Sequence, residues 1–203
     1  MSDTEDSWPP HYNPGPHSHL HAIGVIGITF ASLEGSIDVL YLDRARRENM
    51  PTDLINLYYF SLNEETRLKA INTIFAIYEK DEAIKDCVSN MVAYFAWCRN
   101  CRNQILHAEL YPASLGGKKG VLYLTKRLSK QSPQSGYMRF KLRKLRYIAD
   151  RIRKGVVQCA EIHLYLRFHG HPTNTIPQEI RVYARTLPKK LRIPQTLALD
   201  PHP

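Results

Sequence analysis

Apolar residues recur at alternating steps of three and four along this chain, and this spacing constrains the fold more than any other feature. The first series covers about His19 to Arg47 and ends at Asn49 and Pro51. Its members are Ile23, Ile26, Phe30, Leu33, Ile37 and Leu40. Because residues three and four apart lie on one face of an α-helix, the series predicts a helix that packs against other helices.

Three later segments carry similar patterns. The expected helical segments cover about residues 52–80, 81 to 109 or 110, and 141–168. The first of these is expected to break near residues 61–63, because Ser61 followed by Glu64 resembles a capping box. Pro112 ends the second soon after His107.

Two short segments between the last two expected helices favour β-structure. They are residues 121–125 and 137–141, which are separated by a stretch of Ser, Gln, Pro and Gly. This arrangement predicts a hairpin. We therefore expect an all-α fold, an antiparallel bundle of four to five helices with a small β-hairpin inserted before the last helix.

Both ends of the chain are rich in proline and poor in aliphatic residues. We expect residues 1–17 to form a flexible tail, residues 18–170 a single helical domain, and residues 171–203 an extended or disordered tail. The N-terminus does not resemble a secretory signal, and the apolar run from Ala22 to Ala31 is short for a bilayer span. The four cysteines are expected as reduced thiols. These features predict a cytoplasmic protein without a membrane partner.

Charge is distributed unevenly along the chain, whose net charge is +9. Residues 1–120 hold 11 Lys/Arg and 15 Asp/Glu, a net −4, whereas residues 121–203 hold 17 Lys/Arg and 4 Asp/Glu, a net +13. Such asymmetry favours a polyanionic partner, although a basic helix face can also be merely solvated. The residues expected to contact RNA are Lys126, Arg127, Lys144, Arg151 and Lys154.

The segment from Arg102 to His107 carries groups that cleavage of RNA requires. An imidazole exchanges a proton near neutral pH, so His107 suits transfer from the 2′-hydroxyl or to the departing 5′-oxygen. The guanidinium of Arg102 matches phosphate oxygens and stays charged. Asn103 can hold a hydroxyl, a phosphate oxygen or the imidazole. The sequence shows no tight carboxylate cluster for two metal ions, so neither a metal nor another cofactor is expected.

The spacing of these residues needs a second chain. On a straight helix, Arg102 and His107 lie roughly 140° apart, whereas Asn103 and His107 share a face. Asn100 lies nearby on that polar strip. One chain also supplies only one such histidine, so a symmetric homodimer across this helix would complete the site. Glu34, beside the apolar face of the first helix, is expected either to orient Arg102 or to lie at the edge of that face.

Arg102, Asn103 and His107, on the penultimate long helix of an all-α chain, resemble the motif of the HEPN superfamily. The motif is Arg, a polar residue and then His after a few positions. The resemblance implies a homodimer with a composite, metal-independent endoribonuclease site, of the kind found in toxin–antitoxin and phage-defence systems. An antitoxin or regulatory protein is then a further expected partner.

Three alternatives stay open at this point. Some HEPN proteins lack activity, so a non-catalytic module that dimerises and binds RNA or a protein is the second hypothesis. Arg102 and Asn103 can also simply cap carbonyls at the end of a helix. His17, His19 and His21 form an H-x-H-x-H pattern that could chelate a metal, but a solvated segment is the preferred interpretation.

Overall fold

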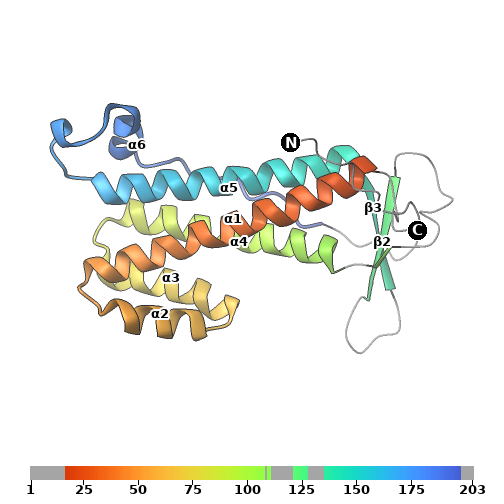
Figure 1. Cartoon of the computed structure of the whole chain (residues 1–203), viewed down its shortest axis with the longest axis horizontal. Helices are drawn as coiled ribbons and strands as arrows, with labels where there is room; N and C mark the ends of the chain where they lie inside the picture. Colours follow the sequence, from red (N-terminus) through yellow and green to blue (C-terminus); the bar gives the residue numbers. More distant parts are fainter. Residues whose placement is uncertain (1–16, 108, 111–120, 128–134, 198–203) are drawn as a thin grey trace, which may run out of the picture. The chain divides into compact units, whose positions relative to one another are not determined.

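The computed structural model describes residues 17–107, 109–110, 121–127 and 135–197, and most of these residues are helical (Figure 1). The helices are α1 (His17–Arg47), α2 (Thr52–Ser61), α3 (Glu64–Tyr78), α4 (Glu82–Leu106), α5 (Leu142–Phe168) and α6 (Arg181–Arg185). Two short 3-10 helices cover Thr173–Thr175 and Gln178–Ile180. The helical character predicted by the apolar spacing is confirmed, as is the break between α2 and α3.

Three strands lie between α4 and α5 in the sequence. They are β1 (Glu109–Leu110), β2 (Val121–Arg127) and β3 (Ser135–Lys141). β2 and β3 pair antiparallel, with residue 121 opposite 141 and residue 127 opposite 135, which confirms the expected β-pairing. β1 pairs with the middle of β2, although its residues were expected to end a helix.

The chain divides into two compact units. Unit 1 comprises Met1–Ile28, Asn100–Asp150 and Thr196–Pro203. Unit 2 comprises Thr29–Arg99 and Arg151–Gln195. The residues 1–16 of the expected N-terminal tail lie outside the described residues.

The buried side chains of unit 2 come from all of its long helices. Gly155 of α5 faces Leu33 of α1, and the Arg47 guanidinium in the last turn of α1 donates to the Leu166 carbonyl near the end of α5. Within this unit α1 and α5 therefore run in the same direction. This pair departs from the antiparallel order expected for neighbouring helices.

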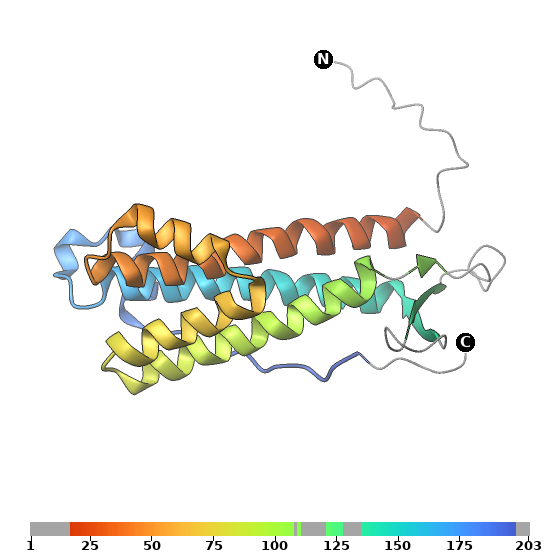
Figure 2. The same cartoon turned by 90° about the horizontal axis from the view of Figure 1, so that it is seen from below.

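The segment after α5 is more ordered than its proline content suggested. Residues 173–185 form the two 3-10 helices and α6, and residues 187–197 are extended (Figure 2). Pro172 and Pro177 each stand directly before a 3-10 helix, a position where the missing N–H costs nothing. The expectation of a wholly extended or disordered tail from residue 171 is therefore corrected for residues 173–185.

By length and composition, α1 is long and apolar enough to cross a membrane. A buried core helix and an N-terminal signal sequence pass the same test; Phe30, Leu33 and Ile37 of α1 are almost fully buried, but only 28% of its most apolar window is buried within the protein. This helix is therefore weak evidence for a membrane segment.

Candidate functional site

The segment with Arg102, Asn103 and His107 lies at the C-terminal end of α4, within unit 1. α4 ends at Leu106, three to four residues earlier than expected, and His107 occupies the turn that follows. The backbone N–H of His107 still donates to the Asn103 carbonyl at 3.2 Å. The histidine is thus tied to the last helical turn without continuing the helix.

The structure brings the three predicted side chains together. Arg102 Nη1 donates to Asn103 Oδ1 at 2.7 Å and lies 3.4 Å from Nε2 of His107. The separation of about 140° on an ideal helix ignored both the length of the Arg side chain and the helix end before His107. Where Arg102 donates to the ring, Nε2 carries no proton and Nδ1 carries it.

The site combines one exposed side chain with neighbours that are partly or fully buried. His107 is exposed, Arg102 and Asn103 are half-buried, and the neighbouring Cys101 and Ile105 are buried. Buried neighbours on either side fix the helix end, whereas the imidazole is open to a ligand. Asn100, predicted to support the site, is exposed one turn earlier on α4.

The buried Cys101 thiol is not a competing nucleophile. Burial raises its pKa to about 12, and the nearby Lys144 charge offsets only part of that shift. A thiol of this kind stays protonated near neutral pH, so it has little thiolate available. The chemistry of this end of α4 therefore falls to the imidazole and the guanidinium.

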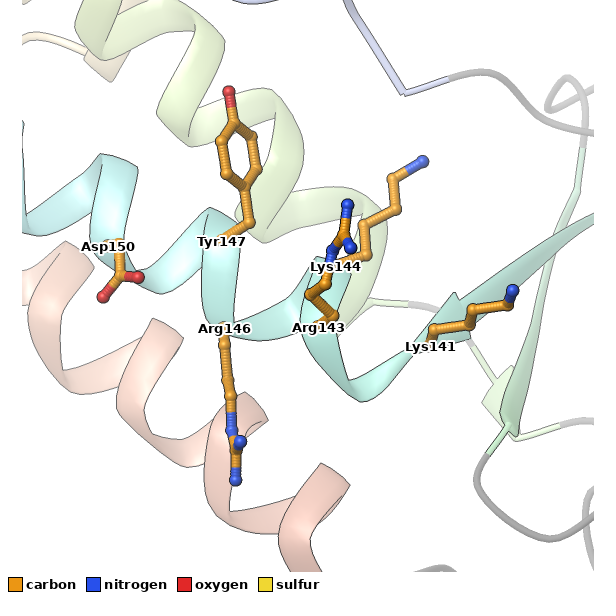
Figure 3. A pocket seen from close by; sticks show the side chains of 6 residues that line it. All are labelled: Lys141, Arg143, Lys144, Arg146, Tyr147 and Asp150. Atoms are coloured by element: carbon orange, nitrogen blue, oxygen red, sulfur yellow. The ribbon is translucent and has the colours of Figure 1, made fainter.

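A basic pocket of about 730 Å³ lies at the start of α5, also within unit 1 (Figure 3). Its described lining residues are Lys141, Arg143, Lys144, Arg146, Tyr147 and Asp150. Tyr147 and Arg146 leave α5 in opposite directions in Figure 3. Four cations against one acid make this pocket attractive to an anion, and the exposed Tyr147 ring offers a stacking surface. Lys144 was predicted as an RNA contact. The pocket places Lys141, Arg143 and Arg146, which were not predicted as contacts, beside it.

Arg151 was predicted to bind RNA, which stays a prediction, and the structure shows what its guanidinium contacts within the fold. Its Nη2 donates to the Arg192 carbonyl at 2.7 Å, and the guanidinium lies 5.9 Å from the centre of the Tyr94 ring. Helical phase turns Arg151 inward, whereas Lys154 stays exposed in unit 2. The side chains of Lys126 and Arg127, on β2, lie outside the described residues.

Glu34 lies in unit 2, where it lines a small cavity beside Asp38, Tyr59 and Arg67. Its expected partner Arg102 belongs to unit 1, so that pairing stays a prediction.

The three N-terminal histidines lie in the first turns of α1. His17 and His21 are exposed, but His19 is only 2% exposed, which corrects the interpretation of a solvated segment. In a helix, residues two apart point to different sides whereas residues four apart share a face, so His17 and His21 lie on one exposed face and the buried His19 points away from them. Among the residues that the structure describes, no group of three or more His, Cys, Asp or Glu side chains could hold a metal ion.

Comparisons of the chain with protein-family models, with curated proteins and with solved structures returned no match.

Proposed function

We propose that the protein is a metal-independent endoribonuclease of the HEPN type, acting as a homodimer. The observation that carries the proposal is the contact among Arg102, Asn103 and the exposed His107 at the end of α4. This contact joins a permanent cation, an amide and a proton-transfer group at one point of the surface. Those groups correspond to the needs of phosphodiester cleavage by the 2′-hydroxyl.

The proposed reaction uses the nucleophile of the RNA itself. An imidazole removes the proton from the 2′-hydroxyl, whose oxygen attacks the adjacent phosphorus. The bond to the 5′-oxygen breaks, and a second imidazole gives that oxygen a proton. The products are a 2′,3′-cyclic phosphate and a 5′-hydroxyl. Arg102 stabilises the charge that accumulates on the phosphoryl oxygens in the transition state.

The position of Arg102 beside His107 also supports a proposal for where the scissile phosphate binds. Two cations would face each other if the ring became protonated while the 3.4 Å contact persisted. A phosphate between them removes that repulsion, because it accepts hydrogen bonds from both groups. We therefore expect the scissile phosphate to insert between the guanidinium and the imidazole and to open their direct contact.

The second imidazole comes from the second protomer. One chain supplies a single histidine at this site, whereas the reaction uses both an acid and a base. Two α4 ends related by a twofold axis would present two His107 side chains and two Arg102 side chains to one RNA strand. Endoribonucleases of the HEPN type act in toxin–antitoxin and phage-defence systems, so an antitoxin or regulatory protein is a further proposed partner.

The test is cleavage of structured and unstructured RNA in excess EDTA by the purified chain. Arg102→Ala and His107→Ala should each reduce cleavage by about 100-fold or more, as expected for a cation and a proton-transfer group. The matched control is His171→Ala, which alters an exposed histidine of unit 2. Cleavage should leave cyclic phosphate ends. Activity that survives both site substitutions would overturn the proposal.

The second candidate is a non-catalytic HEPN-like module that dimerises and binds RNA or a protein. The basic pocket at the start of α5 favours it, because its described residues attract an anion without including a histidine. In that case the RNA-binding constant should fall steeply as the salt concentration rises. Lys144→Ala should reduce the slope of log K against log salt concentration by about 1, which corresponds to the loss of one phosphate contact. Binding without cleavage, unchanged by His107→Ala, would favour this candidate over the enzyme.

A further inference from the structure

Residues 188–195 form an extended segment along α4 and α5, within unit 2 (Figure 2). None of these eight residues is buried: Lys189, Lys190, Arg192, Ile193 and Gln195 are exposed, and the other three are half-buried. The segment therefore contributes little to the apolar core. Its position depends on polar contacts.

Side chains of α4 bind the backbone of this segment along one helix face. Asn90 makes a paired contact with Leu191, in which Nδ2 donates to the carbonyl at 3.2 Å and Oδ1 accepts from the N–H at 2.9 Å. Two turns further along α4, the Trp97 indole N–H donates to the Gln195 carbonyl at 3.2 Å. The Cys87 thiol, one turn before Asn90, donates to the Pro188 carbonyl at 3.5 Å.

Side chains of α5 also bind the backbone of this segment. Gln158 Nε2 donates to the Lys189 carbonyl at 3.1 Å, and Arg151 Nη2 donates to the Arg192 carbonyl at 2.7 Å. Five of the eight carbonyls in the segment thus accept from side chains of two helices. Gln158 is only 6% exposed, so this donor is directed at the segment and not at solvent.

One contact recognises a side chain of the segment. Lys190 forms an ion pair with Asp86, one turn before Asn90 on α4. Because the remaining contacts address the backbone, they would accept many sequences in the same extended conformation. The ion pair adds a preference for a basic residue at one position. Backbone hydrogen bonds for affinity and one side-chain contact for specificity are typical of sites that bind extended peptides.

We propose that the face formed by α4 and α5 in unit 2 is a binding site for an extended basic peptide, and that residues 188–195 are its tethered ligand. The ligand is defined by the contacts: an N–H and a carbonyl at the position of Leu191, a Lys or Arg one residue earlier, and carbonyls directed at Trp97 and Gln158. Because the tether keeps the local concentration of residues 188–195 high, a free peptide competes more effectively when the tethered copy is weakened.

Leu191→Pro weakens the tethered copy and leaves the site intact. Proline has no N–H, so it removes the bond to Asn90 Oδ1 and alters no residue of α4 or α5. The probe is a fluorescent peptide with the sequence of residues 186–197, and its binding to the full chain is followed by fluorescence polarisation. The Leu191→Pro chain should bind this peptide saturably and about tenfold more tightly than the wild-type chain does.

Charge reversal tests the recognition of Lys190. A peptide carrying Lys190→Glu should bind the Leu191→Pro chain about threefold to tenfold more weakly, and adding Asp86→Lys to the chain should restore its binding. In the Leu191→Pro chain, Asn90→Ala should weaken binding of the wild-type peptide. Ser89→Ala, which alters an exposed neighbour on α4, should leave that binding unchanged. Absence of binding to a Leu191→Pro chain with native circular dichroism would overturn the proposal.

Hydrogen exchange on the wild-type chain decides the question even if Leu191→Pro does not fold. Exchange of the Leu191 amide through a local opening, while the α4 amides stay protected, is expected for an exchangeable ligand. Exchange of Leu191 only together with the α4 amides would mean that the segment is a fixed part of the fold and would overturn the proposal.

Discussion

Gly155 of α5 faces side chains of two other helices of unit 2, α1 and α4. A Cβ at this position would lie 3.1 Å from Leu33 Cδ1 and 3.2 Å from Tyr94 Cε1. Gly155→Ala should therefore lower the free energy of unfolding by about 1–3 kcal/mol, because overpacking outweighs the better helix propensity of alanine. The measurement is urea unfolding followed by circular dichroism.

Gly35→Ala is the matched control for that substitution. Gly35 lies in α1 and is exposed, and a Cβ added there would meet no side chain or neighbouring element within 4 Å. Helix propensity alone then acts, so the control should gain about 0.5–1 kcal/mol in the free energy of unfolding. A stabilised Gly155→Ala chain would mean that α1, α4 and α5 pack less closely than these distances require.

A second residue of unit 2 links stability to pH. The fully buried Tyr59 donates its hydroxyl to Asp38 at 2.7 Å, and Arg67 lies 3.3 Å from the same carboxylate. Burial raises the pKa of Asp38, and these two contacts only partly oppose the rise. The folded carboxyl thus holds its proton more tightly than the unfolded one, so acidification stabilises the fold through this group.

Tyr59→Phe should lower the free energy of unfolding by about 1–2 kcal/mol at neutral pH, since it removes a buried hydrogen bond. It should also raise the pKa of Asp38 further. The stability gap between variant and wild type should therefore narrow as the pH falls toward the range where Asp38 is protonated in the folded chain. Urea unfolding at neutral pH and at the lowest pH that keeps both chains folded measures this gap. A gap that widens on acidification would contradict the assignment.

At the scale of elements, the N-terminus of α3 corrects one expectation from the sequence. The capping box expected at Ser61 does not form, because Asn63 is the N-cap and its side chain accepts from the Thr66 N–H at 2.9 Å. Asn63→Ala should cost about 1 kcal/mol of unfolding free energy. Ser61→Ala, which removes only an exposed bond to the Tyr58 carbonyl, should cost much less. Thermal melts of the two variants test which substitution destabilises the chain more. A larger loss of stability for Ser61→Ala than for Asn63→Ala would favour the capping box.

The long helices followed directly from apolar spacing, since burial of one face determines where a helix packs. The N-cap residue of α3 could not be predicted in the same way, because Ser61 and Asn63 lie two residues apart and both residue types are good N-caps. The helical turns between residues 173 and 185 were also missed. They are too short to carry an apolar period, and proline there signals a helix start as readily as a disordered chain.

The candidate site was predictable as residue types but not as geometry. Arg102, Asn103 and His107 stood out from their chemistry, yet ideal helix angles separated Arg102 from His107. The end of α4 at Leu106 and the length of the Arg102 side chain together explain why the two side chains meet. Arg151 likewise shows a geometry that its charge did not predict, because its helical phase turns its guanidinium toward Tyr94 and the Arg192 carbonyl.

At the scale of the whole molecule, the proposed function depends on two copies of the chain. The C-terminal net charge of +13 can bring RNA to the surface, but it cannot supply a second proton-transfer group. α2 exposes a competing apolar surface formed by Leu54, Leu57, Tyr58 and Phe60. The surface on α2 belongs to unit 2, whereas the composite site requires two α4 ends of unit 1 to meet, so the mode of pairing determines whether that site can form.

The most direct measurement is the specific activity on RNA in EDTA as a function of protein concentration, with the dimer fraction measured by analytical ultracentrifugation under the same conditions. Activity per chain should rise in proportion to the dimer fraction and vanish in the monomer. Leu57→Lys, on the exposed face of α2, should leave that relation unchanged. Cleavage by the monomer, or a dimer that never cleaves RNA, would contradict the composite Arg102–His107 site.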